Sequence, residues 1–320
     1  MQQTKRPMLR WLPRGLPLLI VVAAIASTSS AGATGGSSGP GLASSPWIAS
    51  PAPGLHAGDS VSVDGVTLLV PDPGQGAWGI GLRIDGRPEA LGVENSASGS
   101  VTLYRWNDEF PAAPGSAAPA APAAPGACVD TAYRIVHSAW TTAWGWYFNI
   151  NSTPGGVIKT NAELALRSAA TNLTGANNNC GMSDGVSAKH VYRGRTSRSV
   201  NISTGAGCLG SDGVSVVGFG DLPAYDIGFV CWWTWGGRPV SADMRLNKFD
   251  YGWVVNIGPG CVTRYSVEAV ATHELGHVFG LGDLSEVLHG NLTMSLVIRP
   301  CQTSEETLGK GDVYGMEHLY

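Results

Sequence analysis

Residues 273–283 read HELGHVFGLGD, and no other stretch constrains the fold of this chain as strongly. In an α-helix, His273 and His277 lie four residues apart and project from the same face. Gly280 can adopt the left-handed conformation in which many helices end. The chain would then double back and bring Asp283 towards the two histidines. We therefore expect a helix, a glycine turn and three converging side chains.

These residue types are metal ligands. Three protein ligands and one open position are typical of a catalytic zinc ion, whereas a structural zinc ion has four protein ligands. Glu274 lies next to the first ligand, where it can hold a water molecule and take its proton. We expect His273, His277 and Asp283 to bind zinc, with Glu274 as the general base. His289 is an alternative third ligand, and a buried helix with hydrogen-bonded core histidines is the alternative without metal.

The residues before the motif are typical of a helix start. Ser266 can cap the N-terminus, and Glu268 falls in the first turn, where the helix dipole favours an anion. The apolar face is formed by Val267, Val270 and Ala271. The motif is therefore expected on a helix that begins near residue 266.

With its downstream residues, this motif resembles the metzincin clan of zinc peptidases. Their pattern is HExxHxxGxxH or HExxHxxGxxD, followed by a tight turn with a methionine under the metal. Here HGNLTMS offers Met294 for that turn, and the final residues LGKGDVYGMEHLY resemble the last helix of the matrixin branch. The resemblance implies that Asp312 bonds the backbone of the Met-turn. It is close over residues 262–320 and looser back to about residue 128.

Three features depart from the matrixin pattern. The third ligand is Asp283, as in the snapalysin-like secreted bacterial peptidases, and a carboxylate makes metal-bound water less acidic than a third imidazole would. Residues 295–297 lack the Pro and Tyr of the matrixin specificity wall. His190 is the only histidine between residues 138 and 272, so the three-histidine structural zinc site of matrixins cannot form there.

The resemblance implies an α+β fold with a zincin (metzincin) catalytic domain over residues 128–320. Such a domain has a twisted, mostly parallel sheet, an active-site helix, a Met-turn and a C-terminal helix. It implies a secreted zinc-dependent endopeptidase, expected as a monomer, that acts on proteins or peptides. The alternatives are a zinc hydrolase of cell-wall peptides and a non-catalytic binding module. Calcium binding stays open, because no ligand pattern for calcium can be read.

The N-terminus has the pattern of a secretion signal over residues 1–33. Basic residues precede an apolar core of about eleven residues, which is too short to span a bilayer as a helix. Ala31-Gly32-Ala33 supplies a cleavage site. We expect export with cleavage after Ala33 and no stable membrane insertion afterwards. An uncleaved membrane anchor is the alternative.

Charge argues against some classes of partner. Residues 1–33 hold four basic residues and no acidic ones, so the remaining chain carries 16 basic and 24 acidic residues, a net charge of −8. Such a surface repels nucleic acid and anionic membranes. We therefore expect no nucleic-acid partner.

All six cysteines fall within residues 128–320. Because an exported domain meets oxidising conditions, we expect three disulfides, and the sequence leaves all fifteen pairings open.

The region before residue 128 divides by composition. Residues 34–56 are expected to be disordered, residues 57–110 form a small β-rich module, and residues 111–127 form a Pro/Ala linker. The module is a propeptide or an accessory domain. No cysteine occurs between residues 34 and 127, so a thiolate cannot block the metal, although Asp72 or Asp85 could.

Local patterns predict the elements of residues 128–320. A capping box at residues 160–163 predicts a helix to about Leu173. The run Cys231–Trp235 is a candidate for an edge strand that pairs with extended substrate, and core packing and a carbohydrate-binding platform are its alternatives. Strands are expected at residues 132–136, 144–150, 214–219, 227–235 and 242–246.

Overall fold

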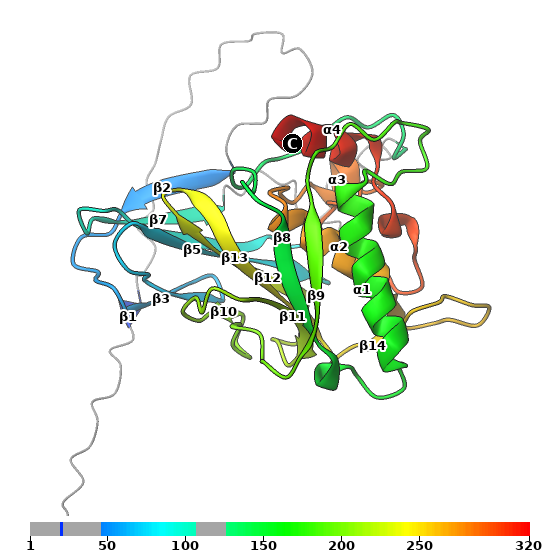
Figure 1. Ribbon diagram of the computed structural model, residues 1–320, viewed down its shortest axis with the longest axis horizontal. Coiled ribbons are helices and arrows are strands. Elements are labelled where there is room, and N and C mark those ends of the chain that lie inside the picture. Colours follow the sequence, from blue (N-terminus) through cyan, green and yellow to red (C-terminus); the bar gives the residue numbers. More distant parts are fainter. Residues whose placement is uncertain (1–19, 22–45, 107–125) are drawn as a thin grey trace, which may run out of the picture.

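The computed structural model describes residues 20, 21, 46–106 and 126–320 (Figure 1). The expected cleavage site after Ala33, residues 34–45 of the segment expected to be disordered, and nearly all of the linker at 111–127 lie outside the described residues. We call residues 46–106 the N-terminal region and residues 126–320 the C-terminal region.

A nine-stranded mixed sheet forms the centre of the molecule, in the order β2-β7-β6-β5-β12-β13-β11-β8-β9. Strands β13, β11, β8 and β9 run parallel to one another, and the other neighbours pair antiparallel. The strands are β2 (Trp47–Pro51), β5 (Gln75–Arg83), β6 (Glu89–Asn95), β7 (Val101–Trp106), β8 (Trp144–Asn149), β9 (His190–Thr196), β11 (Ser215–Gly220), β12 (Asp226–Trp235) and β13 (Arg238–Asn247).

The pairing of β5 with β12 joins the two regions into one sheet. The expected fold class, a mostly parallel zincin sheet preceded by a small β-rich module, is therefore wrong. Four antiparallel strands of the N-terminal region extend the sheet through the ladder between β5 and β12. Strands dominate the described chain, and the two longest helices cover only part of the sheet (Figure 1).

The segment expected to be disordered contains part of this sheet. Trp47–Pro51 pairs with β7, and the Trp47 ring packs edge-on against Trp78 and Trp106, with centroids 5.0 and 5.4 Å apart. The Trp47 indole N–H also donates to the Val136 carbonyl at 3.1 Å. For residues 47–51 the expectation of disorder is wrong, because these aromatic contacts offset the cost of ordering the chain.

The two faces of the sheet carry separate cores. On one face, α1 (Lys159–Thr174) and α2 (Val267–Val278) pack on side chains that include Val230 and Trp232 of β12. On the other face, Phe229 and Trp233 of the same strand pack with a four-stranded sheet. That sheet has the order β1 (Ile20–Val21), β3 (Ser60–Val63), β4 (Val66–Leu69) and β10 (Gly207–Cys208).

The remaining elements are short. They are the strand pair β14 (Gly252–Val254) and β15 (Arg264–Ser266), the helices α3 (Glu286–His289) and α4 (Lys310–Leu319), and two 3₁₀ turns, η1 (Ile150–Ser152) and η2 (Ser304–Glu306). Within the described residues, no helix has the length and apolar composition needed to cross a bilayer.

Two local predictions in the C-terminal region are wrong. Residues 132–136 form no strand beyond one bridge between Ile135 and Leu281. Helix α1 begins at Lys159 without a side-chain cap. Glu163 does not close a capping box, because its carboxylate accepts hydrogen bonds from Tyr192 and Arg195 of β9.

Three disulfides are present, as the cysteine count predicts. They join Cys128 to Cys180, Cys208 to Cys231, and Cys261 to Cys301. The second joins β10 to β12, across the core that the two regions share. Three disulfides fit an extracellular protein.

Candidate metal centre

Helix α2 carries the motif and has defined caps at both ends. Ser266 accepts a hydrogen bond from the Ala269 N–H at 3.2 Å, so the predicted N-cap is confirmed. At the other end, the Gly280 N–H donates to the His277 carbonyl at 3.1 Å and the Leu281 N–H to the Gly276 carbonyl at 2.9 Å, which is a Schellman motif.

Gly280 is required at this turn. Its φ is +102°, and an added Cβ would lie 3.0 Å from the His137 carbonyl oxygen. An alanine here would be both strained and crowded. The turn sends the chain back along the helix, so the sequence after Gly280 can reach the histidine face.

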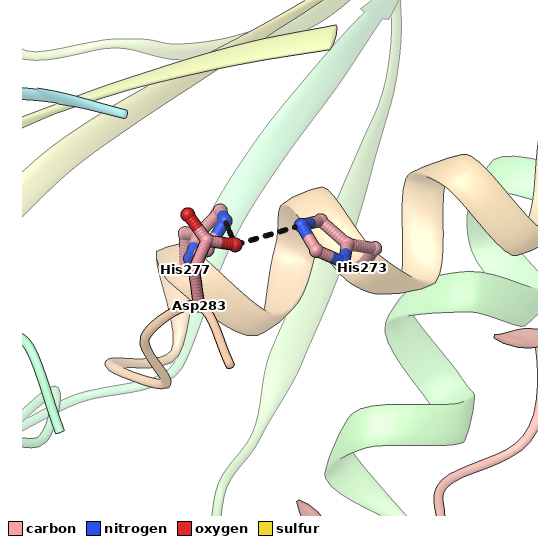
Figure 2. A group of neighbouring side chains, drawn as sticks. All are labelled: His273, His277 and Asp283. Atoms are coloured by element: carbon pink, nitrogen blue, oxygen red, sulfur yellow. Dashed lines mark ion pairs between the residues drawn. The ribbon is translucent and has the colours of Figure 1, made fainter. Parts of the chain in front are cut away.

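Asp283 converges on the two histidines, as Figure 2 shows. Its Oδ1 lies 3.2 Å from His273 Nε2 and 3.3 Å from His277 Nε2. Candidate ligand atoms of the three residues all lie within 4.8 Å of one another, and all three residues are fully buried. We call these three residues the metal triad.

Backbone carbonyls fix the orientation of both imidazoles. His273 Nδ1 lies 2.8 Å from the Thr293 carbonyl oxygen, and His277 Nδ1 lies 2.9 Å from that of Leu281. Because a carbonyl can only accept, each Nδ1 must carry the proton. Both Nε2 lone pairs are thereby left to face Asp283, in the arrangement by which proteins present histidine to a metal.

The facing atoms form a donor set that a cation could join. Both Nε2 atoms and both Asp283 oxygens are buried without a hydrogen-bond partner. Burial acts to raise the pKa of Asp283, but His277 and His273 outweigh it and hold that pKa well below its usual range. Burial likewise acts to lower the pKa of His273, and Asp283 outweighs it and raises that pKa. A divalent ion among the four atoms would satisfy all of them, so the donor set fits zinc.

Glu274, on helix α2, lies beside the triad, and its side chain packs against strand β12. It is fully buried, and both of its carboxylate oxygens lack a hydrogen-bond partner. A Cβ added at Gly228 of β12 would collide with its Oε1, so the glycine makes room for the carboxylate. Burial raises the pKa of Glu274 to about 8, although the nearby His273 and the Leu82 backbone amide favour the ionised form. A pKa near neutral pH suits a group that both takes up and returns a proton.

Met294 lies in a tight turn beneath α2. The turn closes through the Ser295 N–H, which donates to the Leu292 carbonyl at 3.1 Å. Met294 is buried, and a Cβ at Gly276 would collide with its sulfur. The thioether therefore packs against the helix turn between the two histidines.

Asp312 connects α4 to this turn. Its Oδ2 accepts hydrogen bonds from the N–H groups of Thr293 and Gly309, both at 2.8 Å, and its Oδ1 accepts from the Met294 N–H at 3.2 Å. These are the contacts that the metzincin resemblance implies for Asp312. The Thr293 carbonyl accepts the His273 Nδ1 proton, and the Thr293 N–H donates to Asp312. Asp312 therefore helps to position His273 through Thr293.

The structure separates the two candidates for the third ligand. It brings Asp283 to the histidines, whereas His289 Nδ1 lies 2.8 Å from the Asp130 carboxylate. His190 lies elsewhere, on β9, with its Nδ1 3.3 Å from the Trp146 indole nitrogen.

Sequence patterns gave no indication of three further residues that support α2. His137, Trp140 and Tyr320 contact the carbonyls of His277, Val278 and Phe279 at 2.8, 2.6 and 3.0 Å. A helix leaves its last carbonyls without intrahelical partners, so these contacts hold the helix end that carries the second ligand. Their sequence separations from α2 leave no local signal that could have identified them.

Comparisons with known proteins add no assignment: no protein-family model matches this chain, and no curated protein matches it either.

Proposed function

We propose that this protein is an exported zinc-dependent peptidase. The observation that carries the proposal is the buried metal triad, whose Nε2 and carboxylate atoms lack partners and face one another beside Glu274. The metzincin-like spacing of the motif and the contacts of Met294 and Asp312 support the same activity. The three disulfides and the signal-like N-terminus support export.

When bound, zinc would supply a Lewis acid that polarises a peptide carbonyl and makes water acidic enough to react near neutral pH. The protein residues contribute the remaining steps. His273 and His277 would offer Nε2 to the ion, because their Nδ1 protons are donated to backbone carbonyls. Glu274 takes the proton of the attacking water and delivers it to the leaving amine.

The test is cleavage of an unfolded protein, such as reduced casein, by the zinc-loaded chain. We expect cleavage that a zinc chelator abolishes. Glu274→Gln should lower the rate by roughly 10²- to 10⁴-fold, since it removes the general base.

Glu268→Gln is the matched control. It alters a carboxylate on the same helix that contacts Asn172 rather than the triad, and it should cleave like the unaltered chain. If Glu274→Gln cleaves as fast as Glu268→Gln, the peptidase proposal is wrong.

A further inference from the structure

The proposed catalytic residues have no contact with solvent. His273, Glu274, His277 and Asp283 are each 0 % exposed. A peptide must reach these residues to be cleaved, so some part of the structure occupies the approach. The N-terminal region is the part that packs there.

Strand β5 reaches the general base. Its residue Leu82 pairs with Gly228, the β12 residue against which the Glu274 carboxylate rests. Leu82 is fully buried and belongs to the same core as Leu275, the residue after Glu274. Its backbone amide is also the one that favours the ionised form of Glu274.

Two further contacts hold this end of β5 in place. In the turn that follows β5, a Cβ at Gly86 would lie 3.0 Å from the Val297 side chain, just after the Met294 turn. The Arg83 guanidinium lies 3.5 Å from the Asp226 carboxylate at the start of β12. These two approaches hold the end of β5 near Glu274 against the C-terminal region.

Extended peptides commonly bind by adding a strand to the edge of a sheet. Strand β12, which contains the aromatic run considered for this role, pairs with β13 along one edge and with β5 along the other. The edge that passes Glu274 is thus already filled by a strand of the same chain.

We propose that β5 holds the place of an extended peptide substrate on β12, so that the N-terminal region keeps the site latent until β5 leaves. This inference rests on the proposed peptidase function. The two carboxylates considered as metal blockers are not involved. Asp85 is engaged by Arg83 at 2.8 and 2.9 Å, and the cluster that could hold a metal ion among the described residues contains neither Asp72 nor Asp85.

The glycines of β5 provide a way to loosen it. Cβ atoms at Gly79 and Gly81 would lie 2.8 and 2.7 Å from the Phe229 ring of β12. Gly81→Val should therefore force β5 away from β12, while the amino-acid sequence of the C-terminal region stays unchanged. Gly210→Val is the matched control, because a Cβ there meets nothing within 4 Å.

The experiment compares three zinc-loaded full-length chains: unaltered, Gly81→Val and Gly210→Val. It measures hydrogen exchange of the β12 amides, extraction of zinc by a chelator and cleavage of reduced casein. Overpacking of this kind should raise the open population roughly tenfold to a hundredfold, and all three rates should rise accordingly in Gly81→Val alone. Arg83→Gln is a milder change at the same contact between β5 and β12 and should raise the three rates severalfold. It replaces Gly81→Val in the experiment if that variant does not fold.

The outcomes separate the two proposals. If the unaltered full-length chain already cleaves casein as fast as the folded variants, the latency proposal is wrong and the peptidase proposal stands. If exchange and zinc extraction accelerate but no chain cleaves, the peptidase proposal is wrong, and β5 covers the site without standing in for a substrate.

Discussion

Two buried clusters of charged side chains lie close together in this protein, and they are neutralised differently. One is the metal triad with Glu274. The other, which we call the Arg83 cluster, consists of Arg83, Asp85, Glu89 and Asp226. Asp283 faces two imidazole nitrogens without a permanent cation, whereas the second cluster contains a guanidinium. A buried carboxylate needs such a partner, so the comparison supports the proposed metal site at Asp283.

The Arg83 cluster contains its own cation, the guanidinium of Arg83. Arg83 lies 2.8 Å from Asp85, 3.7 Å from Glu89 and 3.5 Å from Asp226. Burial and the adjacent Asp226 raise the pKa of Glu89 to about 8, and burial also raises the pKa of Asp226. At neutral pH this carboxyl pair therefore holds a proton between its members. The guanidinium and the shared proton offset two of the three negative charges, and Asp85, the most exposed of the three carboxyl groups, is 27 % exposed to solvent.

The largest expected difference between the clusters is their response to zinc. Zinc at about a thousandfold excess over its Kd should stabilise the folded chain by about 4 kcal/mol. Thermal unfolding with and without zinc should show this stabilisation in the unaltered chain and in Asp226→Asn. Asp283→Asn should lose most of it, and an equal zinc response in Asp283→Asn would contradict the comparison.

A smaller effect on the free energy of unfolding is expected when the guanidinium of Arg83 is removed. Arg83→Gln leaves Glu89 and Asp226 without their guanidinium, and we expect a loss of roughly 1–3 kcal/mol in the free energy of unfolding, since Arg83 is partly exposed. Urea unfolding measures this loss. Arg198→Gln, which breaks the exposed pair with Asp212, is the matched control and should cost at most about 1 kcal/mol. Equal losses in both variants would show that the Arg83 cluster is not a buried ion pair.

The smallest expected effect is a pH dependence of stability. Because the folded-state pKa of Glu89 is raised to about 8, the folded chain holds a proton that the unfolded chain releases above about pH 4.5. Stability from this group is therefore greatest at low pH and falls as pH rises from about 4.5 towards 8. Glu89→Gln should flatten that slope between pH 5 and 8. If urea unfolding shows the same slope in Glu89→Gln, the shared proton is absent.

Local signals predicted much of the candidate site. Ser266, Gly280 and the spacing of His273, His277 and Asp283 act over a few residues, and the structure places them together. Four strands of the C-terminal region, β8, β11, β12 and β13, also fall close to their expected positions. In each case the determining interaction is a cap, a turn or a run of β-branched and aromatic residues near in sequence.

The fold class was predicted wrongly because it depends on distant contacts. The pairing of β5 with β12 joins residues about 150 positions apart, and nothing local to Leu82 or Gly228 specifies it. The Pro/Ala linker favoured a division into module and catalytic domain. The shared sheet instead arises from apolar residues on both faces of β5 and β12, which a compositional boundary cannot reveal.

The most direct test of the central claim is the zinc content of the purified chain. The full-length protein would be produced with zinc, passed through gel filtration and subjected to elemental analysis beside Asp283→Asn and Asp226→Asn. We predict one zinc ion per chain in the unaltered protein and in Asp226→Asn, and none in Asp283→Asn. A chain without zinc, or one that keeps its zinc after Asp283→Asn, would contradict the assignment of His273, His277 and Asp283 as the metal ligands.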